Sequence, residues 1–257
     1  MTTFVSMTYN IWGGHWLAER TPALRWLFEV REPDLLAVQE LTPSSRDIID
    51  AALPGHRRVD DPFPGWAVQS NLWWRDDLFA MEEYGAEDVG IRAEHARLFW
   101  VRLRPAGSSS SFVYSTAHLT WPGHPQERAD DLNPRVGQAR QVAAALDRLA
   151  GEGPCVFTVD INDYARPLWV LRAAGFADSF AALGRSSPIT HPVVPLIGPG
   201  RGWSAPEPVA KAIDWQFHRG SLRPRCAEVV EFFHEGVAPS DHKPVVVTYT
   251  LPDKEKP

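Results

Sequence analysis

Apolar and polar residues follow two different periods along the first 53 residues. Residues 4–9 alternate with a period of two and predict a strand that ends at Asn10. Residues 21–30 carry apolar side chains at helical spacing, with a proline suited to the first turn, and predict a helix. The short apolar run at 35–38 predicts a buried strand, and residues 44–53 predict a second helix. The chain therefore opens with alternating strands and helices.

The middle of the chain has a hairpin pattern instead. Short apolar runs are separated by turn-rich connections, which is typical of antiparallel strands joined in sequence. The strands predicted there are 71–74, 79–84, 97–103 and 112–118.

Helical spacing returns in the second half. Residues 135–150 and 167–174 predict helices on either side of an apolar strand at 155–159. A loop rich in proline and glycine then occupies residues 186–208. The two closing strands predicted after it are 212–218 and 243–251.

Composition agrees with one globular domain. No linker or repeat divides the chain, so we expect a single domain over residues 1–257 with a frayed tail at 252–257. Hydrophobic residues make up 44% of the chain and charged residues 23%, which is enough for a substantial core. No apolar run approaches the roughly 20 residues that span a bilayer, and no export signal is visible. We therefore expect a cytoplasmic protein, with its isolated cysteines, Cys155 and Cys226, reduced.

The net charge of −6 narrows the choice of partner. Proteins that hold long duplex nucleic acid usually carry a basic face, because counterion release supplies much of the affinity. No basic stripe is present here, which disfavours long duplex DNA. A small or single-stranded substrate fits the charge better.

Polar and ionisable residues recur at the ends of the predicted strands. Groups at strand ends of an α/β sheet converge on one edge, where ligands bind. Asparagine, carboxylate and histidine side chains are suited to binding Mg²⁺ or Mn²⁺ and to moving protons. Taken singly, each has an ordinary structural alternative, such as a turn residue or a core histidine. The residues are Asn10, Glu40, His118, Asp160, Asn162, Asp214, Asp241 and His242.

The order of these residues along the chain carries more information than any one of them. The set resembles the endonuclease/exonuclease/phosphatase superfamily, which has the deoxyribonuclease-like fold, from residue 4 to about residue 250. That resemblance implies a four-layer α/β sandwich, in which two mostly antiparallel sheets pack face to face with helices outside. The segments that carry it are Tyr9-Asn10-Ile11, Gln39-Glu40, Ala117-His118-Leu119, Val159-Asp160-Ile161-Asn162, Ile213-Asp214-Trp215 and Ser240-Asp241-His242.

The resemblance also implies a metal site. Glu40 would be the principal ligand of Mg²⁺ or Mn²⁺, with Asn10 and Asp241 close to the ion directly or through water. A mostly hydrated ion on one or two carboxylates is the usual way in which Mg²⁺ is held.

Catalytic roles follow from the same resemblance. Asp160 would orient or deprotonate the attacking water, and Asn162 would hold that water or a phosphate oxygen. His242 would donate a hydrogen bond to a phosphate oxygen, with Asp214 orienting its ring and favouring the charged form. His118 would contact the phosphate from the other side.

Substrate contacts are expected near these residues. Trp12 and Trp121 follow site residues in loops, where a flat aromatic ring would suit a nucleobase. Arg135 and Gln138 are candidates for contacts with phosphate or sugar, although structural contacts at the start of their helix are the favoured interpretation of both residues. The segment 186–208, which includes Trp203, is expected to form a wall of the substrate pocket. His191 in this segment is expected to be an exposed loop histidine, with a substrate contact as the alternative.

We therefore predict a divalent-metal-dependent phosphoesterase. The favoured activity is that of a phosphodiesterase or nuclease acting on nucleic acid or a nucleotide, similar to the deadenylase and nocturnin-like branch. A phosphomonoesterase or lipid-type phosphodiesterase on the same site is the alternative. An inactive binding module would need the loss of a core residue, and all of them are present.

Overall fold

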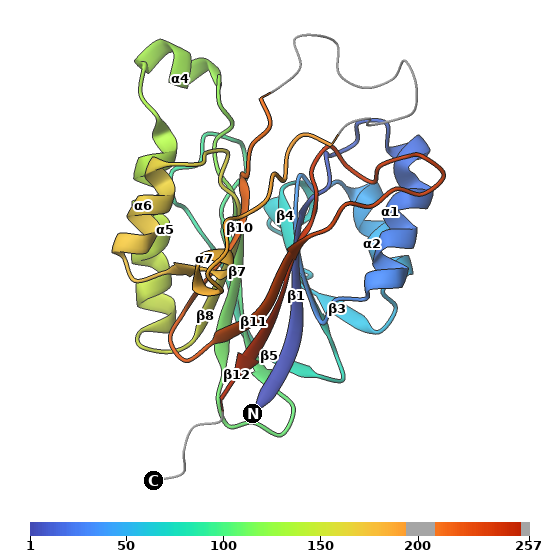
Figure 1. Cartoon of the computed structure of the whole chain (residues 1–257), viewed down its shortest axis with the longest axis vertical. Helices are drawn as coiled ribbons and strands as arrows, with labels where there is room; N and C mark the ends of the chain where they lie inside the picture. Colours follow the sequence, from blue (N-terminus) through green and yellow to red (C-terminus); the bar gives the residue numbers. More distant parts are fainter. Residues whose placement is uncertain (194–208, 253–257) are drawn as a thin grey trace.

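Two β-sheets lie face to face, with helices on their outer sides (Figure 1). The computed structural model describes residues 1–193 and 209–252. The first sheet contains, in spatial order, β11 (Arg223–Val229), β12 (Val245–Leu251), β1 (Thr2–Asn10), β2 (Leu35–Gln39), β4 (Ser70–Arg75) and β3 (His56–Arg58). The second contains β5 (Phe79–Glu87), β6 (Leu98–Pro105), β7 (Phe112–His118), β8 (Cys155–Asp160), β10 (Asp214–Arg219) and β9 (Ala177–Asp178).

Helices complete the four layers. The longer ones are α1 (Leu17–Arg31) and α2 (Pro43–Ala52) on the first sheet, and α5 (Pro134–Ala150) and α6 (Arg166–Ala173) on the second. The shorter ones are α3 (Gly65–Val68), α4 (Pro125–Asp130) and α7 (Ser179–Ala182). One apolar cluster lies between the sheets, and one lies under each helical layer. The predicted sandwich of two mostly antiparallel sheets is therefore confirmed.

Within residues 1–193 and 209–252, none of the helices is both long enough and apolar enough to cross a membrane. The segment 194–208 and the tail 253–257 lie outside the described residues, so most of the predicted pocket wall, including Trp203, is not placed.

The closing strands differ from those predicted. Two were predicted after residue 211, whereas the structure has three, because β11 pairs with β12 at the edge of the first sheet. Most residues of β11 are partly or fully exposed and Pro224 lies within it, so its pattern lacks the apolar run of a buried strand. The short elements β3, β9, α3, α4 and α7 were also missed, since two to six residues show no clear period.

Parallel crossovers bring the strand ends to one edge. β1 and β2 run parallel, with Asn10 opposite Gln39, and β7 and β8 run parallel, with His118 opposite Asp160. β10 is antiparallel to β8 and begins at this edge, so Asp214 lies opposite Asp160. The edge is the upper one in Figure 1.

Buried hydrogen bonds fix one sheet against the other. The Nε2 of Gln39 donates to Thr8 on its own sheet at 2.9 Å and to Thr116 on the facing sheet at 2.7 Å. The Nε2 of Gln216 reaches from the second sheet to the carbonyl of Ser6 in the first, at 3.0 Å. Leaving such buried groups unpaired costs about 1–3 kcal/mol each, so sliding between the sheets is opposed.

Arg20 ties helix α1 to the loops at the upper edge. Its side chain is fully buried although it is charged. The guanidinium donates to the main-chain carbonyls of Ile11, Trp12, Gly13, His15 and Pro239. These carbonyls belong to the loop that follows β1 and to the loop that leads into β12, so one cation holds both.

Replacing Arg20 should therefore destabilise the fold. Arg20→Met leaves several buried carbonyls without a donor, and we expect the free energy of unfolding to fall by about 3 kcal/mol or more. Chemical denaturation followed by circular dichroism measures this change. The matched control is Arg25→Met on the same helix, where an exposed ion pair with Glu29 should contribute less than about 1 kcal/mol. Equal denaturation midpoints for the two variants would contradict this role of Arg20.

His218 should make the fold acid-sensitive. Burial in β10, together with the charge of Arg223, lowers the pKa of His218 to about 4, although Asp178 acts in the opposite direction. The unfolded chain therefore binds a proton at this residue below pH 6.5, while the folded chain binds it only near pH 4. The contribution of His218 to the free energy of unfolding is fully present above pH 6.5 and is lost as the pH falls toward 4. Between pH 7 and pH 5 the loss is about 2 kcal/mol.

This contribution is measured by denaturation at pH 7 and pH 5. His218→Gln should remove that part of the pH dependence, while His15→Gln, at an exposed position, should leave it unchanged. An identical loss of stability in the wild type and in His218→Gln would show that other groups are responsible.

Candidate active site

Asn10 joins the acidic groups of the two sheets. Its Nδ2 donates to Oε1 of Glu40 at 3.1 Å and to Oδ2 of Asp160 at 2.9 Å. Its Oδ1 accepts the main-chain N–H of Trp12 at 3.0 Å. The amide nitrogen thus faces the carboxylates and orients them, and a position of Asn10 close to a metal ion, directly or through water, stays a prediction.

Asp160 lies at the centre of the site, almost completely buried. Burial and the nearby charge of Asp214 raise its pKa, while His118, His242 and Asn10 lower it, and the net direction is upward. A carboxylate with a raised pKa is a better proton acceptor near neutral pH.

His242 and Asp214 form a buried pair. The Nδ1 of His242 lies 2.8 Å from Oδ2 of Asp214, and its Nε2 lies 3.9 Å from Oδ2 of Asp160. Burial alone would lower the pKa of His242, but the charge and hydrogen bond of Asp214, together with Asp241, raise it well above its usual value. The pair therefore favours an imidazolium with Nε2–H directed toward Asp160.

His118 and Asn162 border Asp160 on another side. The Nε2 of His118 lies 3.5 Å from Oδ2 of Asp160 and 3.9 Å from Oε1 of Glu40. Asn162 Nδ2 is 2.9 Å from the same ring nitrogen, and the main-chain N–H of Asn162 donates to Asp160 Oδ1 at 3.0 Å. The structure thus brings the predicted catalytic residues into one cluster.

Asp241 faces the histidines. Its Oδ1 lies 4.0 Å from Nε2 of His242, and its Oδ2 lies 3.7 Å from Nε2 of His191. Burial raises the pKa of Asp241, but the hydrogen bond of His191 and the charges of both histidines lower it, with a net downward direction. Ser240 Oγ donates to the carbonyl of Asn10 at 2.7 Å, which fastens this loop to β1.

His191 was expected to be an exposed loop histidine, and the structure places it in the cluster instead. Only 16% of its side chain is exposed, and its ring centroid lies 4.6 Å from that of His242. Its neighbour Thr190 accepts the main-chain N–H groups of Ile213 and Asp214 through Oγ1. In a loop rich in proline and glycine, a threonine followed by a histidine is a weak signal, so the sequence did not reveal that His191 belongs to the cluster.

Three site residues have unfavourable backbone conformations. Trp12, Glu40 and Asn162 have φ values of 59°, 55° and 51°. Residues other than glycine rarely adopt this region, and each instance costs on the order of 1–3 kcal/mol. Such strain clusters at functional sites, where it fixes the direction of a side chain.

The donor set fits a divalent cation. Glu40, Asp160, Asp214 and Asp241 place four carboxylates at this edge, and the Glu40 side chain is 32% exposed, so an ion can reach it. Among the described residues, ligand atoms within 4.8 Å of one another occur in two groups, one of Asp160, Asp214 and His242 and one of His191, Asp241 and His242, and neither group includes Glu40. Because His242 and Asp214 are already hydrogen-bonded, we interpret them as an acid–base pair. Glu40 remains the most accessible oxygen ligand.

The two tryptophans that were predicted to contact substrate differ in their exposure. Trp12 is half-buried, with its ring stacked on His15 and the Arg20 guanidinium 5.1 Å from its centroid. Trp121 is 48% exposed and contacts His124 edge-on. Of the two, Trp121 has more surface for a substrate.

Arg135 and Gln138 are bonded inside the protein. Arg135 is buried and donates to the carbonyl of Thr120 and to Glu127 Oε2, both at 2.8 Å. Gln138 Nε2 donates to the carbonyl of Gly90 at 2.8 Å and to Thr120 Oγ1 at 2.7 Å. These contacts support the structural alternative for both residues.

Solved structures share this fold at low sequence identity. D. rerio TDP2 complexed with a single-strand DNA product has a TM-score of 0.80 and 17% identity, covering 98% of this chain and 100% of that chain. An endonuclease/exonuclease/phosphatase from Bacteroides vulgatus has a TM-score of 0.77 and 17% identity, with coverage of 98% and 100%. A mannosyl-6-phosphatase from Bacteroides thetaiotaomicron has a TM-score of 0.73 and 18% identity, with coverage of 96% and 100%.

No curated protein sequence is significantly similar to the chain. A family model does match it, however, under the description Endonuclease/Exonuclease/phosphatase family, over residues 7–242. That range includes every residue of the cluster around Asp160. The protein therefore belongs to the Endonuclease/Exonuclease/phosphatase family, whose members are phosphoric ester hydrolases.

Proposed function

We propose that the protein is a divalent-metal-dependent phosphodiesterase that hydrolyses an ester bond of single-stranded nucleic acid or of a nucleotide. The observation that carries this proposal is the position of Asp160. Its carboxylate is bonded to Asn10, which also holds Glu40, and it lies within 4 Å of two imidazoles. Groups for an ion, for a water molecule and for a phosphate thus converge on a single point.

Glu40 would hold Mg²⁺ or Mn²⁺, with Asp241 close to the ion. When bound, the ion would neutralise charge that develops on the phosphate oxygens. Asn10 keeps the Glu40 carboxylate in place from the side of Asp160. Because Glu40 and Asp241 would serve the ion, the Asp160 carboxylate would be available to activate water.

Asp160 would accept the proton of the attacking water, since its raised pKa increases its basicity. The main-chain N–H of Asn162 fixes the other carboxylate oxygen, so one oxygen stays oriented while the other reacts. The Asn162 side chain would hold the water or a phosphate oxygen.

His242 would donate its Nε2–H to a non-bridging phosphate oxygen, while Asp214 fixes the tautomer through Nδ1. His118 would contact the phosphate from the side of Glu40. Donors aimed at oxygens that gain charge stabilise the transition state more than the bound substrate.

The choice of substrate rests on charge and on a structural neighbour. A chain with a net charge of −6 is poorly suited to long duplex DNA, whereas the D. rerio TDP2 structure contains a single-strand DNA product. Trp121 would offer a base a flat, exposed surface. The second candidate is a phosphomonoesterase, which is favoured by the fold shared with the mannosyl-6-phosphatase.

Glu40→Gln should separate metal binding from folding. The variant loses the accessible charge that binds the ion, so we expect Mn²⁺ affinity to fall by more than about tenfold and turnover to fall with it. Calorimetric titration with Mn²⁺ and hydrolysis of a short single-stranded oligonucleotide measure the two effects. Glu152→Gln, on the exposed surface, is the control and should match the wild type. Unchanged Mn²⁺ affinity in Glu40→Gln would remove Glu40 from the metal site.

Asp214→Asn should lower kcat by about 10³-fold, because the amide keeps the shape of the side chain but no longer fixes the catalytic tautomer of His242. KM should change little, since Asp214 does not reach the substrate in this mechanism. Steady-state kinetics on the same oligonucleotide give both values, with Asp147→Asn as an exposed control. A kcat within tenfold of the wild type in a folded Asp214→Asn protein would rule out this role.

A further inference from the structure

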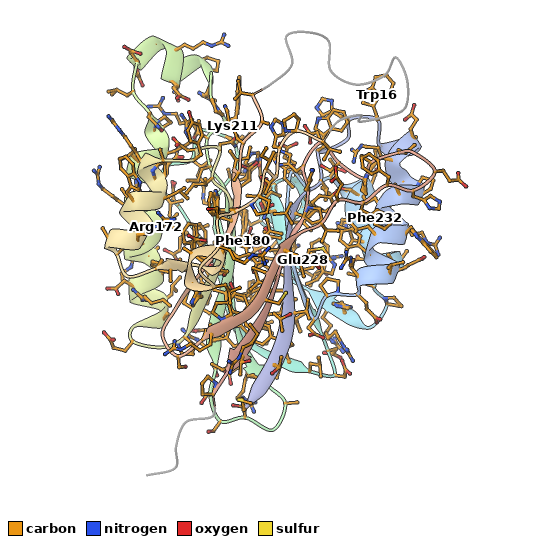
Figure 2. The ribbon with its side chains drawn as sticks, in the orientation of Figure 1. Trp16, Arg172, Phe180, Lys211, Glu228 and Phe232 are labelled. Carbon is orange, nitrogen blue, oxygen red and sulfur yellow. The ribbon has the colours of Figure 1, made fainter. Side chains whose placement is uncertain are left out.

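A tyrosine and a lysine lie side by side next to the site, and no step of the proposed mechanism uses either. The Nζ of Lys211 lies 5.8 Å from the ring centroid of Tyr164. Tyr164 is 63% exposed, and Lys211 is half-buried. Figure 2 shows Lys211 near the upper end of the molecule, where the strand ends converge.

Tyr164 stands on a loop that hydrogen bonds hold firmly. Asp163 Oδ1 accepts the main-chain N–H of Tyr164 at 2.7 Å and that of Ala165 at 2.9 Å. Asp163 Oδ2 accepts a hydrogen bond from Asn133 at 2.7 Å. Only Asp163 lies between Asn162 and Tyr164, so the Cα atoms of these two residues are within about 8 Å of each other. The main chain that carries the exposed ring is therefore held close to Asn162.

Lys211 is fixed by the backbone that also carries the site histidine. Its main-chain N–H donates to the carbonyl of His191 at 2.7 Å, and the N–H of His191 donates to the carbonyl of Lys211 at 3.0 Å. The ring of His191 packs against His242, and Asp214 follows Lys211 by three residues. The main chain of Lys211 is thus held next to the cluster by the same segments that carry His191 and Asp214.

We propose that Tyr164 and Lys211 form a nucleotide subsite, in which the tyrosine ring stacks on the base next to the cleaved bond and the ammonium binds the adjoining phosphate. This inference rests on the proposed phosphodiesterase activity and deepens it. Carboxylates at the site repel any phosphate that is not reacting, so a strand needs a local cation. A lysine beside an exposed ring supplies the charge and the stacking surface together.

An ordinary surface pair would have a different effect. If the Tyr164–Lys211 contact only stabilises its loop, its removal should change KM equally for all substrates. A subsite distinguishes substrates by the base and by the charge that each residue contacts. Single-stranded oligonucleotides with one abasic position, or with one neutral methylphosphonate linkage, remove these groups one at a time.

Tyr164→Ala should raise KM about tenfold for the intact oligonucleotide and leave it unchanged for the oligonucleotide that is abasic next to the cleaved bond. Tyr164→Phe should behave like the wild type, because it keeps the ring. Lys211→Ala should raise KM by a similar factor for the natural strand and leave it unchanged for the strand with the methylphosphonate at the adjoining linkage. Tyr84→Ala, which removes a partly exposed tyrosine of β5, is the control.

Thermal unfolding of each variant confirms that it is folded before kinetics are compared. Equal KM increases for the intact and the modified oligonucleotides would overturn the subsite while leaving the phosphodiesterase activity in place. Failure of the wild type to cleave any single-stranded oligonucleotide would overturn both the subsite and the proposed function. Position-specific effects on KM would establish the subsite.

Discussion

The site depends on a buried cation that is surrounded by main-chain carbonyls. Arg20 lies in α1, yet its guanidinium holds the loop after β1 and the loop before β12 at once. Its charge also faces Asp241 and Glu40, which partly offsets the burial that lowers its pKa. An arginine can satisfy so many acceptors because its donors are fixed in a planar fork. Docking of α1 against the first sheet therefore fixes the two loops that adjoin Asn10 and Asp241.

The site also requires that the two sheets pack in one fixed position relative to each other. Glu40 and Asn10 belong to the first sheet, whereas Asp160, Asp214 and His118 belong to the second, so the site forms only where the sheets meet in the correct register. Hydrogen bonds such as that from Gln39 to Thr116 set this register from inside the sandwich. Apolar contacts alone are less directional and would tolerate a small displacement. The strained residues at the edge are held by this rigid surrounding structure.

Much of this arrangement could be predicted from the chain. The alternating periods gave the long strands and helices, and the resemblance supplied the sandwich and the cluster. Three kinds of feature could not be predicted. Edge strand β11 is exposed and lacks an apolar pattern. Arg20 looks like an ordinary charged residue near a helix start, and its burial arises from tertiary packing. His191 sits in a loop, where its position depends on main-chain hydrogen bonds to the distant Lys211. Arg135 and Gln138 have internal partners, Glu127 and Thr120, that their helical pattern does not reveal.

The strand order has a consequence for biosynthesis. Thr2 pairs with Leu251, so β1 adjoins β12, which is synthesised much later and inserts between β11 and β1 (Figure 1). Until translation reaches Leu251, one side of β1 has no neighbour, and an open strand edge invites association with other chains. Asp241 and His242 also emerge just before this final strand. A nascent chain therefore exposes a strand edge and lacks part of its site until β12 has emerged, and the site becomes complete as the first sheet closes.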